Sequence, residues 1–145
     1  MKPQFEKEEG VFLPKVTIKG CYYGDKTFPS LNNYLAEIGR NPRLGNALKR
    51  DFMMICNSAI RVQLKRYKAK KPIILHYIYY EPAHGQKRDF MNIHFCFAKF
   101  FEDSLQTCKV IENDNSDYLL NETHDFYYIE SGEPYIEVYI EEIDE

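Results

Sequence analysis

The chain has 145 residues, of which 44% are hydrophobic and 15% aromatic. This composition suits one packed domain spanning residues 1–145 and excludes a disordered chain. No apolar run reaches the roughly 18–20 residues of a membrane-spanning helix, and the polar N-terminus does not resemble a secretory signal. We therefore expect a cytoplasmic protein with no membrane partner. The cysteines at 21, 56, 96 and 108 lack the spacing of a zinc site or disulfide framework, which predicts free thiols.

The charge of the chain is strongly segregated although its net value is only −3. Residues 40–88 carry 12 Lys and Arg against two acidic residues, whereas residues 100–145 carry 14 acidic residues against Lys109 alone. A basic middle segment of this kind permits nucleic-acid binding, and a solvated basic helix face is the simpler alternative.

The first half of the chain predicts a strand, a loop and a long helix. Val16 and Ile18 alternate with polar residues, which indicates a strand over 15–19. Residues 28–43 are rich in Pro, Asn and Gly, so we expect a loop with at most a short helical turn. From about residue 44 to residue 67, apolar residues recur every three or four positions, as in an amphipathic helix. The predicted apolar stripe is Leu48, Phe52, Ile55, Ala59 and Val62.

The second half predicts a strand, a helix and two further strands. Pro72 ends the first helix, and "IILHYIYYE" at 73–81 is apolar on both faces, as expected of a central strand. A helix is predicted from about residue 90 to residue 107, followed by an acidic loop at 112–118. Strands at 124–130 and 134–143 flank "SGE", which predicts a hairpin. The expected fold is α+β, with one small mixed sheet packed against two main helices.

The second helix presents a narrow polar stripe beside its apolar face. Residues 89, 92, 96, 99 and 103 share the polar stripe, whereas Ile93, Phe97, Phe100 and Phe101 look like core. An exposed helix face explains this stripe adequately. The functional alternative is a Mg²⁺ site for phosphodiester hydrolysis, in which Asp89 and Asp114 supply oxygen ligands and Lys99 stabilises the transition state or protonates the leaving group.

The same residues fall in an order that resembles the RusA-type Holliday-junction resolvases, a family common in prophages. The matching features of the helix and its following loop are Asp89, Asn92, Lys99, "DSL" at 103–105 and "VIENDN" at 110–115. Earlier and later parts also look like this family, namely "PSLNNY" at 29–34, "RLGNALKRDF" at 43–52 and "YIEVYIEE" at 135–142. The resemblance therefore extends over nearly the whole chain.

This resemblance implies a RusA-like fold, an endonuclease activity and a set of functional residues. It implies that Asp89 and Asp114 bind Mg²⁺, with Mn²⁺ as an alternative, and that Lys99 is catalytic. It further implies supporting roles for Asn92, Asp103 and Asn113. The expected substrate is branched DNA such as a four-way junction, cut by a homodimer. The residues expected to hold DNA phosphates are Lys49, Arg50, Lys87 and Arg88, within and beside the basic segment 40–71.

The chain departs from the family pattern at Met91, which stands where the family has a second Asp. A thioether is a poor Mg²⁺ ligand, so Met91 cannot replace a carboxylate. Three hypotheses remain: a working nuclease in which Asp103, Glu112 or Asp117 completes the site, a branched-DNA-binding relative that does not cut, and a protein-interaction domain.

The chain is rich in tyrosine, with 12 residues and no Trp. The tyrosines of "CYYG" at 21–24 and "YIYY" at 77–80 could stack on unpaired bases. We favour the alternative that both groups pack in a sheet.

Overall fold

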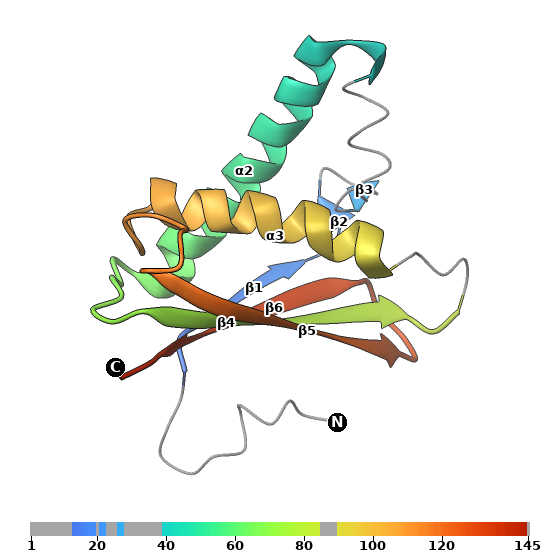
Figure 1. Cartoon of the computed structure of the whole chain (residues 1–145). Coiled ribbons are helices and arrows are strands. Elements are labelled where there is room, and N and C mark those ends of the chain that lie inside the picture. The colour runs from blue at the N-terminus through green and yellow to red at the C-terminus, as the bar shows by residue number, and fades with distance from the viewer. Residues whose placement is uncertain (1–12, 20, 23–25, 28–38, 85–89, 145) are drawn as a thin grey trace.

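The computed structural model describes residues 13–19, 21–22, 26–27, 39–84 and 90–144. Two helices lie on one face of a four-stranded sheet (Figure 1). The helices are α2 (Pro42–Leu64) and α3 (Phe90–Thr107). The strands of the sheet are β1 (Lys15–Lys19), β4 (Ile73–Pro82), β5 (Leu119–Ile129) and β6 (Tyr135–Glu142), and a separate two-stranded ribbon is formed by β2 (Cys21–Tyr22) and β3 (Lys26–Thr27). The predicted α+β class, with a mixed sheet and two main helices, is confirmed.

The four-stranded sheet has the order β1-β6-β4-β5. Strand β4 pairs in parallel with β5 and antiparallel with β6, and β6 pairs antiparallel with β1. The predicted hairpin of the last two strands is therefore wrong, because β4 lies between them. β4 can take this central place since it is largely apolar on both faces, with seven consecutive buried residues from Leu75 to Glu81.

Helix α2 begins and ends at residues that explain its bounds. The side chain of Asn41 accepts a hydrogen bond of 2.9 Å from the Arg43 amide, and Pro42 occupies the first turn, where its missing N–H costs nothing. Turn residues that predicted a loop thus form the N-terminal cap. The helix ends at Leu64 because Lys65 adopts the left-handed conformation, with φ of 48°.

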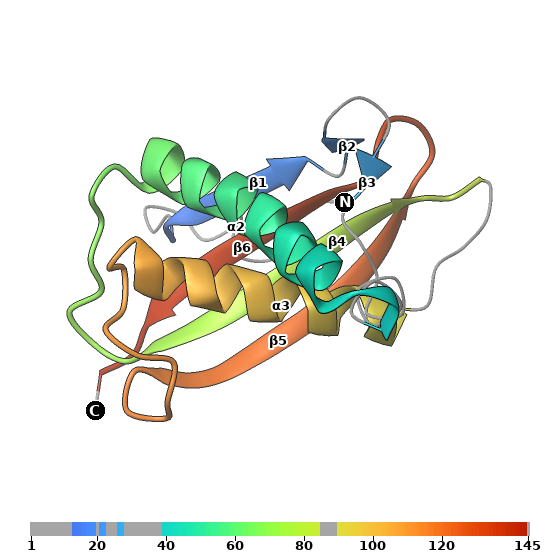
Figure 2. The ribbon, with the colours of Figure 1, turned by 90° about the horizontal axis from the view of Figure 1, so that it is seen from above.

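The core lies between the helices and the sheet. From above, α2 lies toward the β1 side of the sheet and α3 toward the β5 side (Figure 2). Among the α2 side chains that the structure describes, Phe52, Cys56 and Ile60 are buried, so the stripe is rotated from the predicted one. Val62 is 68% exposed, and the side chain of Leu48 lies outside the described residues. In α3 the predicted core residues Phe97, Phe100 and Phe101 are buried, and they pack against sheet residues that include Leu75, Tyr77, Tyr79 and Val138.

The tyrosines at 77–80 pack within the sheet, as we favoured. Tyr77 and Tyr79 lie in the helix-facing core, and Tyr80 lies in a smaller cluster with Ile78 and Tyr139. The ring of Tyr80 stacks on that of Tyr135, with 4.3 Å between centroids. The side chains of Cys21, Tyr22 and Tyr23 lie outside the described residues.

Within the described part of the chain, neither helix has the length and apolar character that crossing a membrane requires. Of the four cysteines, Cys56 and Cys108 have described side chains, and both are free thiols.

Candidate functional site: carboxylates beside helix α3 and a basic end of the fold

Helix α3 carries the residues at the centre of the sequence-based hypothesis. Lys99 is exposed, and Asp103 is half-buried with its Oδ2 3.3 Å from Nζ of Lys49 on α2. This ion pair joins one predicted DNA-binding residue to one predicted supporting residue. For Asn92 the structure describes only the backbone, in the first turn of α3. Asp89, Lys87 and Arg88 lie outside the described residues.

The acidic loop after α3 is ordered by its own side chains. Oδ1 of Asn113 accepts a hydrogen bond of 3.1 Å from the Asn115 amide, and Oδ1 of Asn115 accepts one of 2.9 Å from the Asp117 amide. Tyr118 donates its hydroxyl proton to Glu112 across 3.0 Å. Asn113 therefore forms a local turn, whereas the carboxylate of Asp114 is exposed at the tip of this loop.

The loop brings Asp114 close enough to Glu102 of α3 for its charge to act on that carboxyl group. The pKa of Glu102 is raised to about 8, first by burial and then by a hydrogen bond with Glu122 of β5; the charges of Glu122 and Asp114 add to the effect. The hydroxyl of Tyr77 donates to Oε2 of Glu102 across 2.7 Å, which opposes the rise. Glu102 and Glu122 can share a hydrogen bond only when one of them is protonated, so the pair retains a proton near neutral pH.

A continuous polar network extends from this pair across the sheet. Glu122 Oε1 lies 3.0 Å from His124 Nε2, and His124 Nδ1 lies 2.9 Å from the hydroxyl of Tyr79. The imidazole of His124 also stacks on Tyr77, with 4.7 Å between ring centroids. Burial and the neighbouring carboxylates raise the pKa values of Tyr77 and Tyr79, so both remain neutral donors.

Sequence reasoning missed Glu102, Glu122 and His124. Glu102 falls outside the polar stripe through residues 89 and 103, and β5 was predicted to begin only at residue 124. The parallel pairing that places Leu75 opposite Glu122 and Tyr77 opposite His124 has no local sequence signal. The alternation of Glu122 and His124 on one face of an extended strand is the signal that could have joined these two residues.

A Mg²⁺ ion requires several oxygen ligands that converge on one point. Asp114, Glu102 and Glu122 have the right chemistry, but among the described residues no group of three or more His, Cys, Asp or Glu side chains is arranged to hold a metal ion. The described carboxylates are therefore of the type that binds Mg²⁺, but too few of them converge to form a complete site. Phe90, the residue after Asp89, begins α3, and the loop with Asp114 follows the end of this helix, which has 18 residues or a length of about 27 Å.

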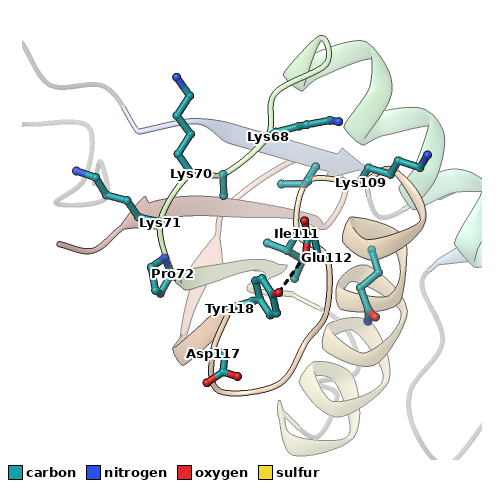
Figure 3. A pocket seen from close by; sticks show the side chains of 12 residues that line it. Lys68, Lys70, Lys71, Pro72, Lys109, Ile111, Glu112, Asp117 and Tyr118 are labelled. Carbon is teal, nitrogen blue, oxygen red and sulfur yellow. Dashed lines mark hydrogen bonds between the residues drawn. The ribbon is translucent and has the colours of Figure 1, made fainter. Parts of the chain in front are cut away.

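Lysines, in contrast to these carboxylates, gather at the end of the fold where both helices terminate. A cavity of about 600 Å³ lies between the α2–β4 loop and the α3–β5 loop (Figure 3). Lysines 68, 70, 71 and 109 stand around it, and the cavity also borders Glu112, Asp117 and Tyr118. Arg50, a predicted DNA-binding residue, is exposed on α2.

No protein-family model matches this chain, and a search of curated proteins found no relative.

Proposed function

We propose that this protein is a Mg²⁺-dependent endonuclease that cuts four-way or related branched DNA by paired nicks in recombination and repair. The order of motifs around α3, and their resemblance to RusA-type resolvases, support this proposal. The structural feature that supports it is that the charge of Asp114, in the loop after α3, contributes to the raised pKa of Glu102, although less than burial and Glu122 do. A cytoplasmic location is part of the same proposal.

In this proposal Asp89 and Asp114 would hold the metal and Lys99 would be the catalytic cation. Because α3 has 18 residues, or about 27 Å, Asp114 of one copy would complete the site of Asp89 in a second copy. A bound Mg²⁺ would supply a water of lowered pKa and positive charge beside the phosphate. On the Asp114 side of the site, Glu102 would be the third carboxylate once its proton is displaced, because Asp103 is paired with Lys49 and Glu112 with Tyr118. Lys99 is exposed, so its ammonium is open to a phosphate that lies along α3.

The basic segment provides the phosphate contacts of the proposed complex. Lys49, Arg50, Lys87 and Arg88 would hold the arms of the junction, and release of DNA counterions would make binding weaken steeply with salt. The charges of Glu137 and Glu141 belong to β6 of the sheet, away from α2 and its basic residues. These two negative charges therefore do not oppose binding through the helices.

A second function, branched-DNA binding without cleavage, is favoured by two observations. Met91 removes one expected carboxylate, and the ion pair with Lys49 neutralises Asp103, one of the groups that could replace it. Such a protein would keep the basic surface and lose the nicking reaction.

We further propose that the protein acts as a homodimer, since paired nicks need two sites related by a two-fold axis. On α2, Met54 and Val62 are 59% and 68% exposed. They flank a shallow apolar hollow that also involves Ile55 and Ala59. This apolar face of α2 is suited to pair with the same face of a second copy, because a two-fold axis places identical surfaces opposite each other.

The test is cleavage of a synthetic four-way junction in Mg²⁺ and, separately, in Mn²⁺, with linear duplex as the substrate control. Paired nicks that disappear in Asp114→Asn support the nuclease, and their loss in Glu102→Gln supports the role of that residue. Salt-sensitive junction binding without nicks supports the second function, which predicts that Met91→Asp creates activity. Absence of both binding and cleavage contradicts both and favours a protein-interaction domain.

A further inference from the structure

The lysine-lined cavity at the end of the two helices is not used by the proposed nicking reaction. Its lining contains four lysines against two acidic residues, Glu112 and Asp117, together with apolar and aromatic side chains. Ala69, Val110 and Ile111 give it an apolar base, Tyr118 contributes an aromatic ring, and lysine side chains surround the opening. In Figure 3 the ring of Tyr118 lies near Ile111, with its hydroxyl bonded to Glu112, while Lys68, Lys70 and Lys109 extend outward. An aromatic ring with cations around it is the combination that binds a base together with its phosphates.

The basic residues near this cavity outnumber their acidic partners. Between residues 61 and 71 there are six Lys or Arg residues and no acidic residue, and all six are exposed. Lys71 pairs with Asp144. For Lys68, Lys70 and Lys109, the described part of the chain shows no ion pair. Three ammonium groups are thus available to an anionic ligand.

Positive φ values occur at basic residues in the two chain segments that meet at the cavity, of which Lys109 lines it. The non-glycine residues with positive φ in the described part of the chain are Lys65 at 48°, Arg66 at 68° and Lys109 at 59°. A left-handed conformation costs a side-chain-bearing residue about 1 kcal/mol or more, and Gly or Asn is the usual occupant. All three positions that bear this cost hold a basic residue and lie in the two segments that meet here.

The loops that form the cavity are held in place. The amide of Ala69 donates to the Val110 carbonyl across 3.0 Å, which joins the α2–β4 loop to the turn after α3. Glu142 of β6 accepts hydrogen bonds from the amides of Lys70 and Lys71, at 2.7 and 3.0 Å, and from the Tyr67 hydroxyl at 2.8 Å. A site with fixed backbone loses less entropy on binding than a mobile loop would.

We propose that this cavity binds a single-stranded segment of DNA, with one unpaired base against Tyr118 and flanking phosphates against Lys68, Lys70 and Lys109. The inference rests on the proposed DNA-binding function and adds a strand-specific subsite to it. Forks, flaps and junctions that are opened at the branch point expose unpaired nucleotides, whereas linear duplex and a fully paired four-way junction do not. The length of α3, 18 residues or about 27 Å, would separate this subsite from Lys87 and Arg88, which precede the helix.

The experiment measures binding of a fluorescently labelled 12-nucleotide oligo-dT to the protein by fluorescence anisotropy, over a range of salt concentrations. We expect Tyr118→Leu to weaken binding about fivefold or more, and Tyr118→Phe, which keeps the ring, to change it less than twofold. Lys109→Gln should weaken binding about threefold and reduce the slope of log K against log salt by about 0.7, the value of one phosphate contact on a single strand. Lys19→Gln, an exposed lysine of β1, is the charge-matched control and should leave binding unchanged. Thermal melts by circular dichroism check that each variant is folded.

Several outcomes overturn the inference. Absence of oligo-dT binding does so, and so does binding that Tyr118→Leu and Lys109→Gln leave unchanged. If poly-glutamate competes with oligo-dT as well as unlabelled oligo-dT does, the cavity binds any polyanion. If thymidine monophosphate competes equally well, the cavity binds a free nucleotide and not a strand. A protein that nicks junctions and fails this test retains its proposed function without the subsite. Conversely, Tyr118-dependent oligo-dT binding without junction binding or cleavage contradicts the proposed function and leaves a single-strand binding site.

Discussion

Glu102 joins α3 to the sheet through a hydrogen bond that requires a proton. Its pKa is about 8 in the folded protein, against 4.5 for an ordinary Glu. Between these values the folded state holds a proton that the unfolded state has released. The contribution of this group to stability is therefore complete below pH 4.5 and is lost as the pH rises through about 8.

We predict that Glu102→Gln removes the loss of folding stability that occurs as the pH rises through about 8. The amide of Gln is neutral at every pH, can donate to Glu122 and can accept from Tyr77, so the variant should be more stable than the parent by about 1–2 kcal/mol at pH 9. Urea unfolding at pH 6 and pH 9 measures the difference. A parent protein whose stability does not fall between these pH values, relative to Glu102→Gln, contradicts the shared proton.

Lys65 ends α2 in a conformation that normally belongs to glycine. Its φ of 48° and ψ of 63° are left-handed values, which a residue with a Cβ atom adopts at a cost. Lys65→Gly should raise the free energy of unfolding by about 0.5–1 kcal/mol, less any gain in the entropy of the unfolded chain. Lys68→Gly, at a position without positive φ, is the control and should give no gain. A variant at Lys65 that is less stable than the parent would show that the lysine side chain itself supports the turn.

Residues that bury apolar surface were largely predictable from the sequence, and residues that form the polar network were not. Phe97, Phe100 and Phe101 recur at helical spacing, and this periodicity alone identifies them as core. The partners of Glu102 lie on β4 and β5, which are distant in the chain, so nothing local indicates that it is half-buried and protonated.

The loop between α2 and β4 is anchored by one side chain of β6. Burial favours a raised pKa for Glu142, but hydrogen bonds from Tyr67, Lys70 and Lys71 and the charge of Lys71 outweigh it, and the pKa is lowered. Because the pKa is lowered in the folded state, the contribution to stability is present above about pH 4.5, the ordinary value for Glu, and is lost as the pH falls through the folded value.

Glu142→Ala should release this loop. We expect a loss of about 1–2 kcal/mol at pH 7, since three hydrogen bonds to a partly solvated carboxylate are removed, and a smaller loss at pH 4. The amides of residues 67–71 should exchange hydrogen faster in the variant, and oligo-dT should bind more weakly because Lys68 and Lys70 lose their fixed positions. Glu141→Ala, the neighbouring change on β6, should leave exchange in this loop unaltered. Unchanged exchange in Glu142→Ala would contradict the anchoring role.

The order of helices and large strands was predicted correctly, whereas the pairing of the strands was not. Alternating residues identify β1 and β6, and the bounds of α3 match the prediction. The short segment 130–134 suggested a hairpin, since such connections usually join neighbouring strands. Here β4 is the strand best able to bury both faces, and it separates β5 from β6. Loop length is a weaker determinant of pairing than the apolar surface of the central strand.

The fold converts a segregation of charge along the chain into a segregation in space. The C-terminal end of α2, the following loop and Lys109 gather at one end of the molecule, around the cavity of Figure 3. Acidic residues of β6 instead find partners on neighbouring strands: Glu137 lies 3.1 Å from Lys15, and Glu141 lies 2.9 Å from His76. The basic segment was evident in the sequence, but its convergence with Lys109 depends on the tertiary contact between Ala69 and Val110.

The apolar face of α2 provides the test of assembly. Val62 is 68% exposed and Met54 59%, so two large apolar side chains face solvent on the same helix. If this face meets its own copy across a two-fold axis, each substitution enters the interface twice. Val62→Lys would then place two unpaired charges in an apolar contact and should raise the dimer dissociation constant at least tenfold.

Analytical ultracentrifugation over a range of protein concentrations measures this change. Leu120→Lys is the matched control, because Leu120 is an exposed apolar residue, at 41%, on β5 at the far edge of the sheet. We expect it to leave the dimer intact. A parent chain that sediments as a monomer contradicts the dimer, and a Val62→Lys variant that remains dimeric places the interface elsewhere. A monomeric Val62→Lys that still binds junctions but yields single instead of paired nicks would connect this face of α2 to the proposed reaction, since each monomer would then cut one strand independently.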